Sequence, residues 1–195
     1  MKRSLKIAAL VLAFAGLSVA AKAQTTTSTS TTTKDGIRYS IGVEAGIPVS
    51  NLKNTHTWNL GGSVQADIPV ASQLFVTVNA GYNNIFGKKD YAGVAGADVP
   101  NMQLIPVKAG LKYFVVPNFY VQGEAGAAFL LNKNDLGFNK STAFVYAPQV
   151  GVQFPVSASG NFIDAGVRYE ATTKYRTGID DSKVSFLGLR VAYGF

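Results

Sequence analysis

The chain is 195 residues long, the length of a single domain. It contains no cysteine, which excludes disulfides, zinc–thiolate sites, thiol catalysis and a lipidated N-terminal cysteine. The formal net charge is +7, but the first 23 residues hold four bases and no acid, which leaves 14 basic and 11 acidic residues in the rest of the chain. This balance indicates no nucleic-acid-binding surface.

Residues 1–23 have the pattern of a secretory signal peptide. Basic residues at positions 2, 3 and 6 precede an almost unbroken apolar run of 14 residues, from 7 to 20. The run is too short to span a bilayer as a helix. Ala21-Lys22-Ala23 then supplies the small residues of a cleavage site. The sequence therefore predicts export, with cleavage near Ala23/Gln24.

Residues 24–36 separate this leader from the patterned part of the chain. Nine consecutive hydroxyl residues, from Thr25 to Thr33, occupy most of the segment. Such a composition buries no apolar surface and so does not offset the entropy that folding would cost. We expect a disordered tether here.

From residue 37 onward, apolar residues recur at every second position, which is the period of a half-buried β-strand. The alternation is clearest at the end of the chain, where one face carries Leu187, Leu189, Val191, Tyr193 and Phe195. It recurs in eight segments, at about 37–46, 58–70, 74–82, 105–113, 119–129, 144–154, 163–170 and 187–195. The sequence thus predicts an all-β domain over 37–195, without helices.

The connections between the predicted strands alternate in length. The second, fourth and sixth are tight turns, near Ala71-Ser72, Pro117-Asn118 and 157–160. The others are longer, at about 48–57, 84–100, 131–141 and 174–183. Short periplasmic turns and long external loops are typical of an eight-stranded antiparallel up-and-down transmembrane β-barrel. Within the strands, Pro106 and Pro148 each remove a ladder donor, which predicts either bulges or different strand boundaries.

The two faces of the predicted barrel differ in charge. The polar face carries five acids and five bases, namely Glu44, Asp67, Glu124, Asp164, Glu170, Arg38, Lys108, Lys112, Arg168 and Arg190. An eight-stranded barrel has an interior just wide enough for side chains to fill, so this face predicts a lumen of paired charges. The other face is nearly free of charge and has two predicted aromatic girdles: Tyr39, Tyr113, Phe119, Phe154 and Phe195 at the turns, Trp58, Tyr82, Phe129 and Tyr146 at the loops.

Counting along the chain gives an approximate register for two ladders. Strands one and eight must pair to close the barrel, and setting Ile37 opposite Phe195 makes Gly42 level with Arg190. Around the turn at residue 117, Glu124 comes opposite residue 109. Both positions fall near mid-height on the polar face.

The register gives specific partners in the lumen. Isolated charges are costly to bury, so each needs an opposite charge nearby. We expect Glu44 to pair with Arg190 and Glu124 with Lys108, and Arg168 to lie close enough to join them. Such a network would fill the lumen and block conduction.

The leader, the eight alternating segments and the terminal strand resemble those of the outer-membrane β-barrel domain family. Its small members are of the outer membrane protein X type and the outer membrane protein A transmembrane-domain type, and the start of the tether resembles the porin-like family of Bacteroidetes. The resemblance covers residues 37–195. It implies that the barrel assembly machinery reads a terminal signal, here Leu189, Val191, Tyr193 and Phe195.

The predicted function is that of a structural and surface-interaction scaffold in the outer membrane of a Gram-negative cell envelope. The expected partners are outer-membrane lipid and lipopolysaccharide, and we expect a monomer without cofactor, metal site or nucleic-acid partner. We expect no enzyme activity, because the lone histidine, His56, is predicted in a loop with no serine or carboxylate at triad spacing. Alternatives are a small pore, a soluble lipocalin-like binder and a lipid A-modifying barrel enzyme.

Overall fold

The computed structural model describes residues 36–133, 136, 140–175 and 182–195. The predicted signal peptide at 1–23 lies outside the described residues, as does the predicted tether except for Gly36. Parts of the connections predicted at 131–141 and 174–183 lie outside them too. Arg38–Phe195 forms one compact unit.

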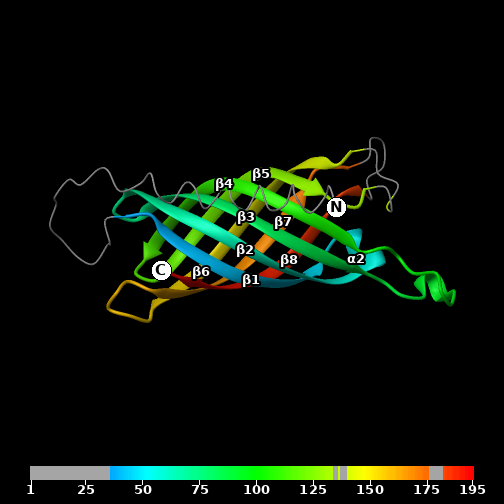
Figure 1. Ribbon diagram of the computed structural model, residues 1–195, viewed down its shortest axis with the longest axis horizontal. Coiled ribbons are helices and arrows are strands. Elements are labelled where there is room, and N and C mark those ends of the chain that lie inside the picture. The colour runs from blue at the N-terminus through cyan, green and yellow to red at the C-terminus, as the bar shows by residue number, and fades with distance from the viewer. Residues whose placement is uncertain (1–35, 134–135, 137–139, 176–181) are drawn as a thin grey trace, which may run out of the picture. The chain divides into compact units, whose positions relative to one another are not determined.

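The described residues form eight antiparallel β-strands that pair in chain order and close into a barrel (Figure 1). The strands are β1 (Arg38–Pro48), β2 (His56–Ala71), β3 (Leu74–Gly87), β4 (Met102–Val116), β5 (Phe119–Leu130), β6 (Thr142–Pro155), β7 (Phe162–Thr172) and β8 (Ser185–Gly194). The barrel closes because β1 pairs with both β2 and β8. This architecture confirms the predicted fold class.

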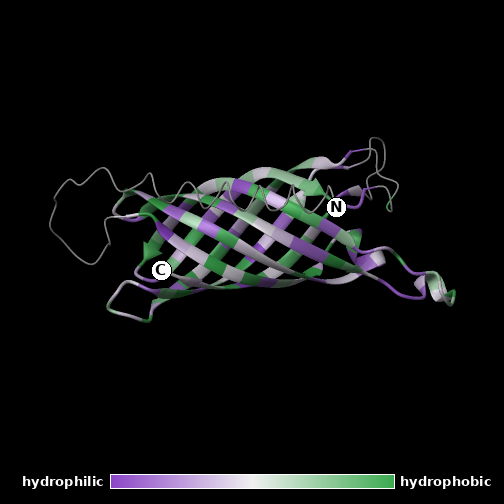
Figure 2. Ribbon diagram, in the orientation of Figure 1, coloured by the Kyte–Doolittle hydropathy of each residue, from purple (hydrophilic) through white to green (hydrophobic). Residues whose placement is uncertain are grey.

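Hydrophilic and hydrophobic residues alternate along the strands (Figure 2). Because successive side chains of a strand point to opposite faces, one set faces the lumen and the other the outer wall. In β1, Ile41 and Val43 point outward and are 59% and 66% exposed, whereas Ser40 and Glu44 point inward and are 5% and 6% exposed. The predicted faces are therefore confirmed, and most of the predicted girdle aromatics are among the exposed large side chains. A lipocalin-like binder would need the opposite arrangement, with apolar side chains around the cavity.

The two predicted registers are each displaced along the chain. In the closing ladder, Arg190 lies opposite Glu44, and Gly42 lies opposite Ala192. The shift arises because Phe195 exchanges two backbone hydrogen bonds with Tyr39, at 3.1 and 2.9 Å, and so cannot pair with residue 37. In the β4–β5 ladder Glu124 lies opposite Gly110 rather than residue 109, and the pairing shifts between residues 114 and 116, beside the turn.

Pro106 and Pro148 lie inside β4 and β6, but neither causes a bulge or ends its strand. The β3–β4 pairing stops at Ala80–Val107 and resumes in the same register at Asn83–Leu104. The β6–β7 pairing stops and resumes in the same way around Pro148. Each proline thus interrupts one ladder for two residues, because it has no amide hydrogen to donate. The predicted bulges are wrong. The strand limits do differ from the predicted ones, since β4 begins at Met102 and β6 at Thr142, but both strands still enclose their prolines.

The long connections lie at one end of the barrel, here called the loop end, and the tight turns lie at the other, the turn end (Figure 1). The β1–β2 connection contains a short helix, α2 (Leu52–Thr55), which the alternation pattern did not predict. The β3–β4 connection spans 88–101, later than predicted, because β3 continues to Gly87 in its ladder with His56. No helix among the described residues is long and apolar enough to cross a membrane.

Candidate functional site

Three groups of buried side chains follow one another along the lumen. The middle one, here called the charged layer, comes from inward positions of six strands. Each of its members is buried, at 6% exposure or less: Glu44, Asp67, Lys108, Lys112, Glu124, Asp164, Arg168, Glu170 and Arg190. Charges buried this deeply are tolerated only when they are paired and hydrogen-bonded.

Arg168 lies at the centre of one part of the charged layer. Its Nη1 atom lies 2.9 Å from Glu44 Oε1, and its Nη2 atom lies 3.6 Å from Glu124 Oε2. Its Nε atom donates a 2.7 Å hydrogen bond to Gln149. One guanidinium therefore holds two carboxylates that come from opposite halves of the chain.

Lys108 contacts two carboxylates, of which one was expected. Its Nζ atom lies 3.8 Å from Glu124 Oε2, the predicted partner. Glu170 of β7 is closer and accepts a hydrogen bond from the same ammonium group. Glu170 was placed on the polar face by its position in the sequence but was not assigned a partner.

Arg190 lies opposite Glu44 across the closing ladder, and its Nε atom is 3.6 Å from Glu44 Oε1. Its hydrogen bonds, however, go elsewhere, to the hydroxyls of Ser63 at 3.2 Å and Ser40 at 3.1 Å and to Asp164 at 3.4 Å. Arg168 rather than Arg190 is thus the nearest cation to Glu44. The five residues of the predicted network are all in the charged layer, with a different set of preferred partners.

A second group of ion pairs was missed by the sequence reasoning. Lys112 Nζ lies 2.8 Å from Asp67 Oδ2 and 3.5 Å from Asp164 Oδ2. Tyr120 donates a 2.8 Å hydrogen bond to Asp164. Asp67 and Lys112 come from β2 and β4, which are not neighbours, so counting along adjacent strands does not bring them together. The sequence did place both residues on the polar face of their strands, and this was the signal that could have pointed to a contact in the lumen.

At the turn end of the lumen an aromatic layer surrounds Arg38. The guanidinium carbon of Arg38 lies 4.2 Å from the ring centroid of Phe75, 5.1 Å from that of Phe162 and 5.7 Å from that of Phe114. Phe75 and Phe114 also pack edge to face, with centroids 5.7 Å apart. A cation held over aromatic faces is attracted by the ring quadrupoles, so this layer is both dense and positively charged.

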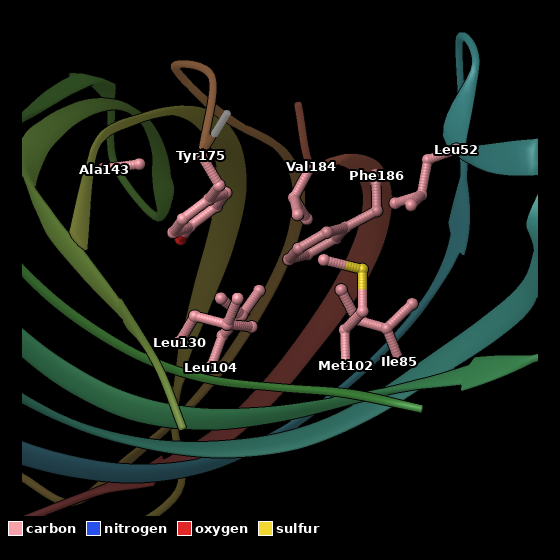
Figure 3. Packing of buried hydrophobic residues seen from close by; sticks show 9 residues of the cluster. All are labelled: Leu52, Ile85, Met102, Leu104, Leu130, Ala143, Tyr175, Val184 and Phe186. Atoms are coloured by element: carbon pink, nitrogen blue, oxygen red, sulfur yellow. The ribbon is translucent and has the colours of Figure 1, made fainter. Parts of the chain in front are cut away.

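At the loop end of the lumen lies an apolar layer (Figure 3). Strands β3 to β6 and β8 contribute most of it, and α2 and the β7–β8 connection contribute the rest: Leu52, Ile85, Met102, Leu104, Leu130, Ala143, Tyr175, Val184 and Phe186. Burial raises the pKa of the Tyr175 phenol, so this group stays neutral and donates to the Ala128 carbonyl at 3.3 Å. Neither this layer nor the aromatic one was predicted from the sequence.

The remaining predicted residues lie apart from these layers. His56 is the first residue of β2 and is only 5% exposed, so the prediction of a loop residue is wrong. Its Nδ1 atom pairs at 2.9 Å with the hydroxyl of the neighbouring Thr55, not with a carboxylate. The predicted assembly residues Leu189, Val191, Tyr193 and Phe195 point outward on the barrel wall.

Comparison with known proteins shows the fold alone. No family model and no curated protein sequence matches the chain. The crystal structure of the outer membrane protein OprG from Pseudomonas aeruginosa is similar, with a TM-score of 0.50 and 11% identity over 81% of this chain and 93% of OprG. The crystal structure of Ail, the attachment invasion locus protein of Yersinia pestis, has a TM-score of 0.49 and 15% sequence identity, and the match covers 82% of this chain and 97% of Ail. A de novo designed transmembrane β-barrel has a TM-score of 0.42 and 16% sequence identity, and the match covers 81% of this chain and 95% of the designed one.

The fold is therefore that of an eight-stranded outer-membrane-type β-barrel, similar to the barrel of OprG. The more specific family predicted from the sequence, of the outer membrane protein X and A type, has no matching family model. It remains a prediction.

Proposed function

We propose that the protein is exported, loses residues 1–23 near Ala23/Gln24, and works in the outer membrane as a monomeric scaffold with a closed lumen. Its loops would contact lipopolysaccharide and molecules outside the cell. The observation that carries this proposal is the contrast between an exposed apolar wall and three layers of buried side chains in the lumen. The fold of OprG supports the location.

The outer wall has the chemistry of a lipid-facing surface. Each strand is 10 to 16 residues long, while a tilted strand needs about 9–11 residues to cross the hydrocarbon. Many large apolar side chains on this wall are 38–66% exposed, which in water would be costly. In a bilayer the same side chains are solvated by lipid, and the backbone groups are paired around the closed barrel.

The filled lumen supports a scaffold rather than a pore. An eight-stranded barrel leaves room for little more than its own side chains. Here the aromatic, charged and apolar layers lie one after another along the axis, so opening one of them would still leave two in the path of an ion. The proposal therefore predicts no steady conductance even from a variant in which one layer is thinned.

Planar-bilayer recording of the refolded full-length protein tests this prediction. Wild type and Phe186→Ala, which thins the apolar layer, are both expected to give silent bilayers, with a heat-modifiable gel shift to show that each is folded. A matched outward variant, Leu189→Ala, controls for changes in insertion. Steady single-channel steps from folded wild-type protein would overturn the closed lumen.

Surface proteolysis tests the location and orientation. In intact cells, added protease should cut the connections at 88–101 or 131–141 and should leave the tether at 24–36 uncut. Permeabilising the outer membrane should then expose the tether. Cleavage of the tether alone in intact cells would show that the orientation is inverted, and recovery of the protein outside the outer-membrane fraction would contradict the proposed location.

A further inference from the structure

A hollow of about 570 Å³ opens where β6, β7 and β8 meet the β1–β2 connection at the loop end. Tyr146, Tyr169 and Ser185 line it from outward positions of the three strands. Tyr169 lies opposite Leu187 in the β7–β8 ladder, and Leu187 belongs to the exposed outer wall. The hollow is therefore on the outer wall of the barrel and not in the lumen.

The β1–β2 connection borders this hollow through Ser50 and Asn51 and is anchored to β8. Val49 donates a 2.9 Å hydrogen bond to the Ser185 carbonyl, and the Ser185 hydroxyl donates one of 3.2 Å to the Val49 carbonyl. As a result Ser185 is only 6% exposed, although its neighbour along the same face, Leu187, is 42% exposed. The hollow is a built recess beneath an anchored connection.

The lining of the recess mixes apolar surface with several polar side chains, unlike the wall beneath it. Its described lining includes two tyrosines, Ser50, Thr173, Ser185 and Lys183. The Thr173 hydroxyl already accepts a hydrogen bond from the Phe144 amide, at 3.1 Å. The rings of Tyr146 and Tyr169 lie 6.3 Å apart at 54°. Further along the same outer face, the wall carries apolar Val150, Val167 and Leu189. The polar recess thus begins where the apolar band ends.

The recess lies at the loop end of the outer wall, where the proposed location would put the boundary between acyl chains and headgroups. Tyrosines gather at this depth because the ring is apolar and the hydroxyl is wet. The β6–β7 ladder is interrupted just below it, between Tyr146–Ala171 and Gln149–Arg168. Aromatic rings can stack on a sugar, hydroxyls can hydrogen-bond to it, and a lysine binds phosphate as a point charge.

We propose that this recess binds the phosphorylated sugar headgroup of an outer-leaflet glycolipid. The tyrosine rings lie against the sugar, the serine and threonine hydroxyls bind its hydroxyl groups, and Lys183 binds a phosphate. The acyl chains extend from the recess along the apolar wall. This inference rests on the proposed outer-membrane location and names the lipid partner of the barrel.

Native mass spectrometry of the refolded full-length protein in detergent, with diphosphorylated lipid A as the probe, tests the site. Lys183→Gln should weaken binding of this lipid by about fivefold or more. It should change binding of dephosphorylated lipid A much less. Tyr146→Leu should weaken both lipids, because it removes the ring. Lys89→Gln, which removes a lysine of another loop-end connection, is the matched control and should bind like wild type.

Several outcomes would overturn the inference. One is equal lipid A binding by wild type and Lys183→Gln. Another is an equal loss in Lys89→Gln, which would show general attraction to positive charge. Binding of free glucosamine 1-phosphate as strong as that of lipid A would assign the recess to a soluble sugar. Cell fractionation is a separate readout: a protein absent from the outer membrane contradicts the proposed function, whereas equal binding by the variants in a correctly located protein contradicts only this inference.

Discussion

The charged layer and the apolar layer of the lumen share strands β4, β5 and β8, yet they stabilise the barrel differently. β4 contributes Lys108 and Lys112 to the charged layer and Met102 and Leu104 to the apolar one. The charges are stabilised only by particular partners at particular distances, whereas apolar side chains are satisfied by any neighbour that fills the space. The charged layer should therefore be brittle, in the sense that removing one partner greatly lowers the free energy of unfolding. The apolar layer should tolerate substitutions that keep its volume.

The largest effect is expected when the charged layer loses one partner. Arg168→Met removes the nearest cation from Glu44 and a second contact from Glu124. Leaving buried charge uncompensated should lower the free energy of unfolding by about 3–5 kcal/mol. Urea unfolding of the protein in lipid vesicles, followed by the heat-modifiable gel shift, measures this change.

The double variant Arg168→Met with Glu44→Gln provides the control for that prediction. It should recover part of the loss, because it also removes the carboxylate left without its nearest partner. A cost for Arg168→Met no larger than that of a conservative apolar swap would contradict the view that the charged layer is brittle.

A smaller effect is expected from a cavity in the apolar layer. Leu104 is 1% exposed, and Leu104→Ala should cost about 2–3 kcal/mol, in the lower part of the range for such changes because the layer lies at the loop end and can partly collapse. Leu104→Met keeps the volume and should cost less than about 1.5 kcal/mol. Equal losses for the two variants in the same unfolding assay would show that this layer is as specific as the charged one.

The aromatic layer contains both a charge and apolar side chains. A substitution in it should lower the free energy of unfolding less than the substitutions in the other two layers. Arg38→Ala removes a cation from three aromatic rings and from Asp67, whose Oδ2 atom lies 3.5 Å away. The Arg38 side chain is 19% exposed, so solvent weakens both contacts, and we expect a loss of about 1–2 kcal/mol. Arg38→Lys keeps the positive charge and should therefore lose less stability than Arg38→Ala. A larger loss for Arg38→Ala than for Arg168→Met would reverse the ranking of the layers.

The smallest effect on stability is expected from a substitution on the outer wall. The same substitution should, however, affect assembly in the cell. Phe195 is 49% exposed, and Phe195→Ser should change the unfolding of refolded protein little. If the terminal residues are an assembly signal, the amount of folded protein in the membrane should nevertheless fall sharply. Phe154→Ser, an outward phenylalanine with 50% exposure, is the matched control. Equal membrane levels for both variants would contradict the assembly role.

The faces, the strand order and the alternation of turns and loops could be predicted because each depends on near neighbours in the chain. The partners in the lumen could not. Arg168 and Glu44 are 124 residues apart and come from strands that do not pair, so their contact depends on the diameter and stagger of the closed barrel. Met102 and Leu104 were missed for a simpler reason, since the predicted strand began at residue 105 and left the first inward positions of β4 unread.

The ladder between β1 and β8 has a consequence for how the protein folds. Among the described strands it alone joins partners from opposite ends of the chain, and the other ladders join consecutive strands. Hairpins close short loops and form early, whereas this last pairing must wait for the whole sheet. Before it forms, Arg190 cannot hydrogen-bond to Ser40 and Ser63 across the seam, and inward charges would meet lipid. Closure and charge pairing should thus occur together, so that a half-built barrel is the least stable species on the folding pathway.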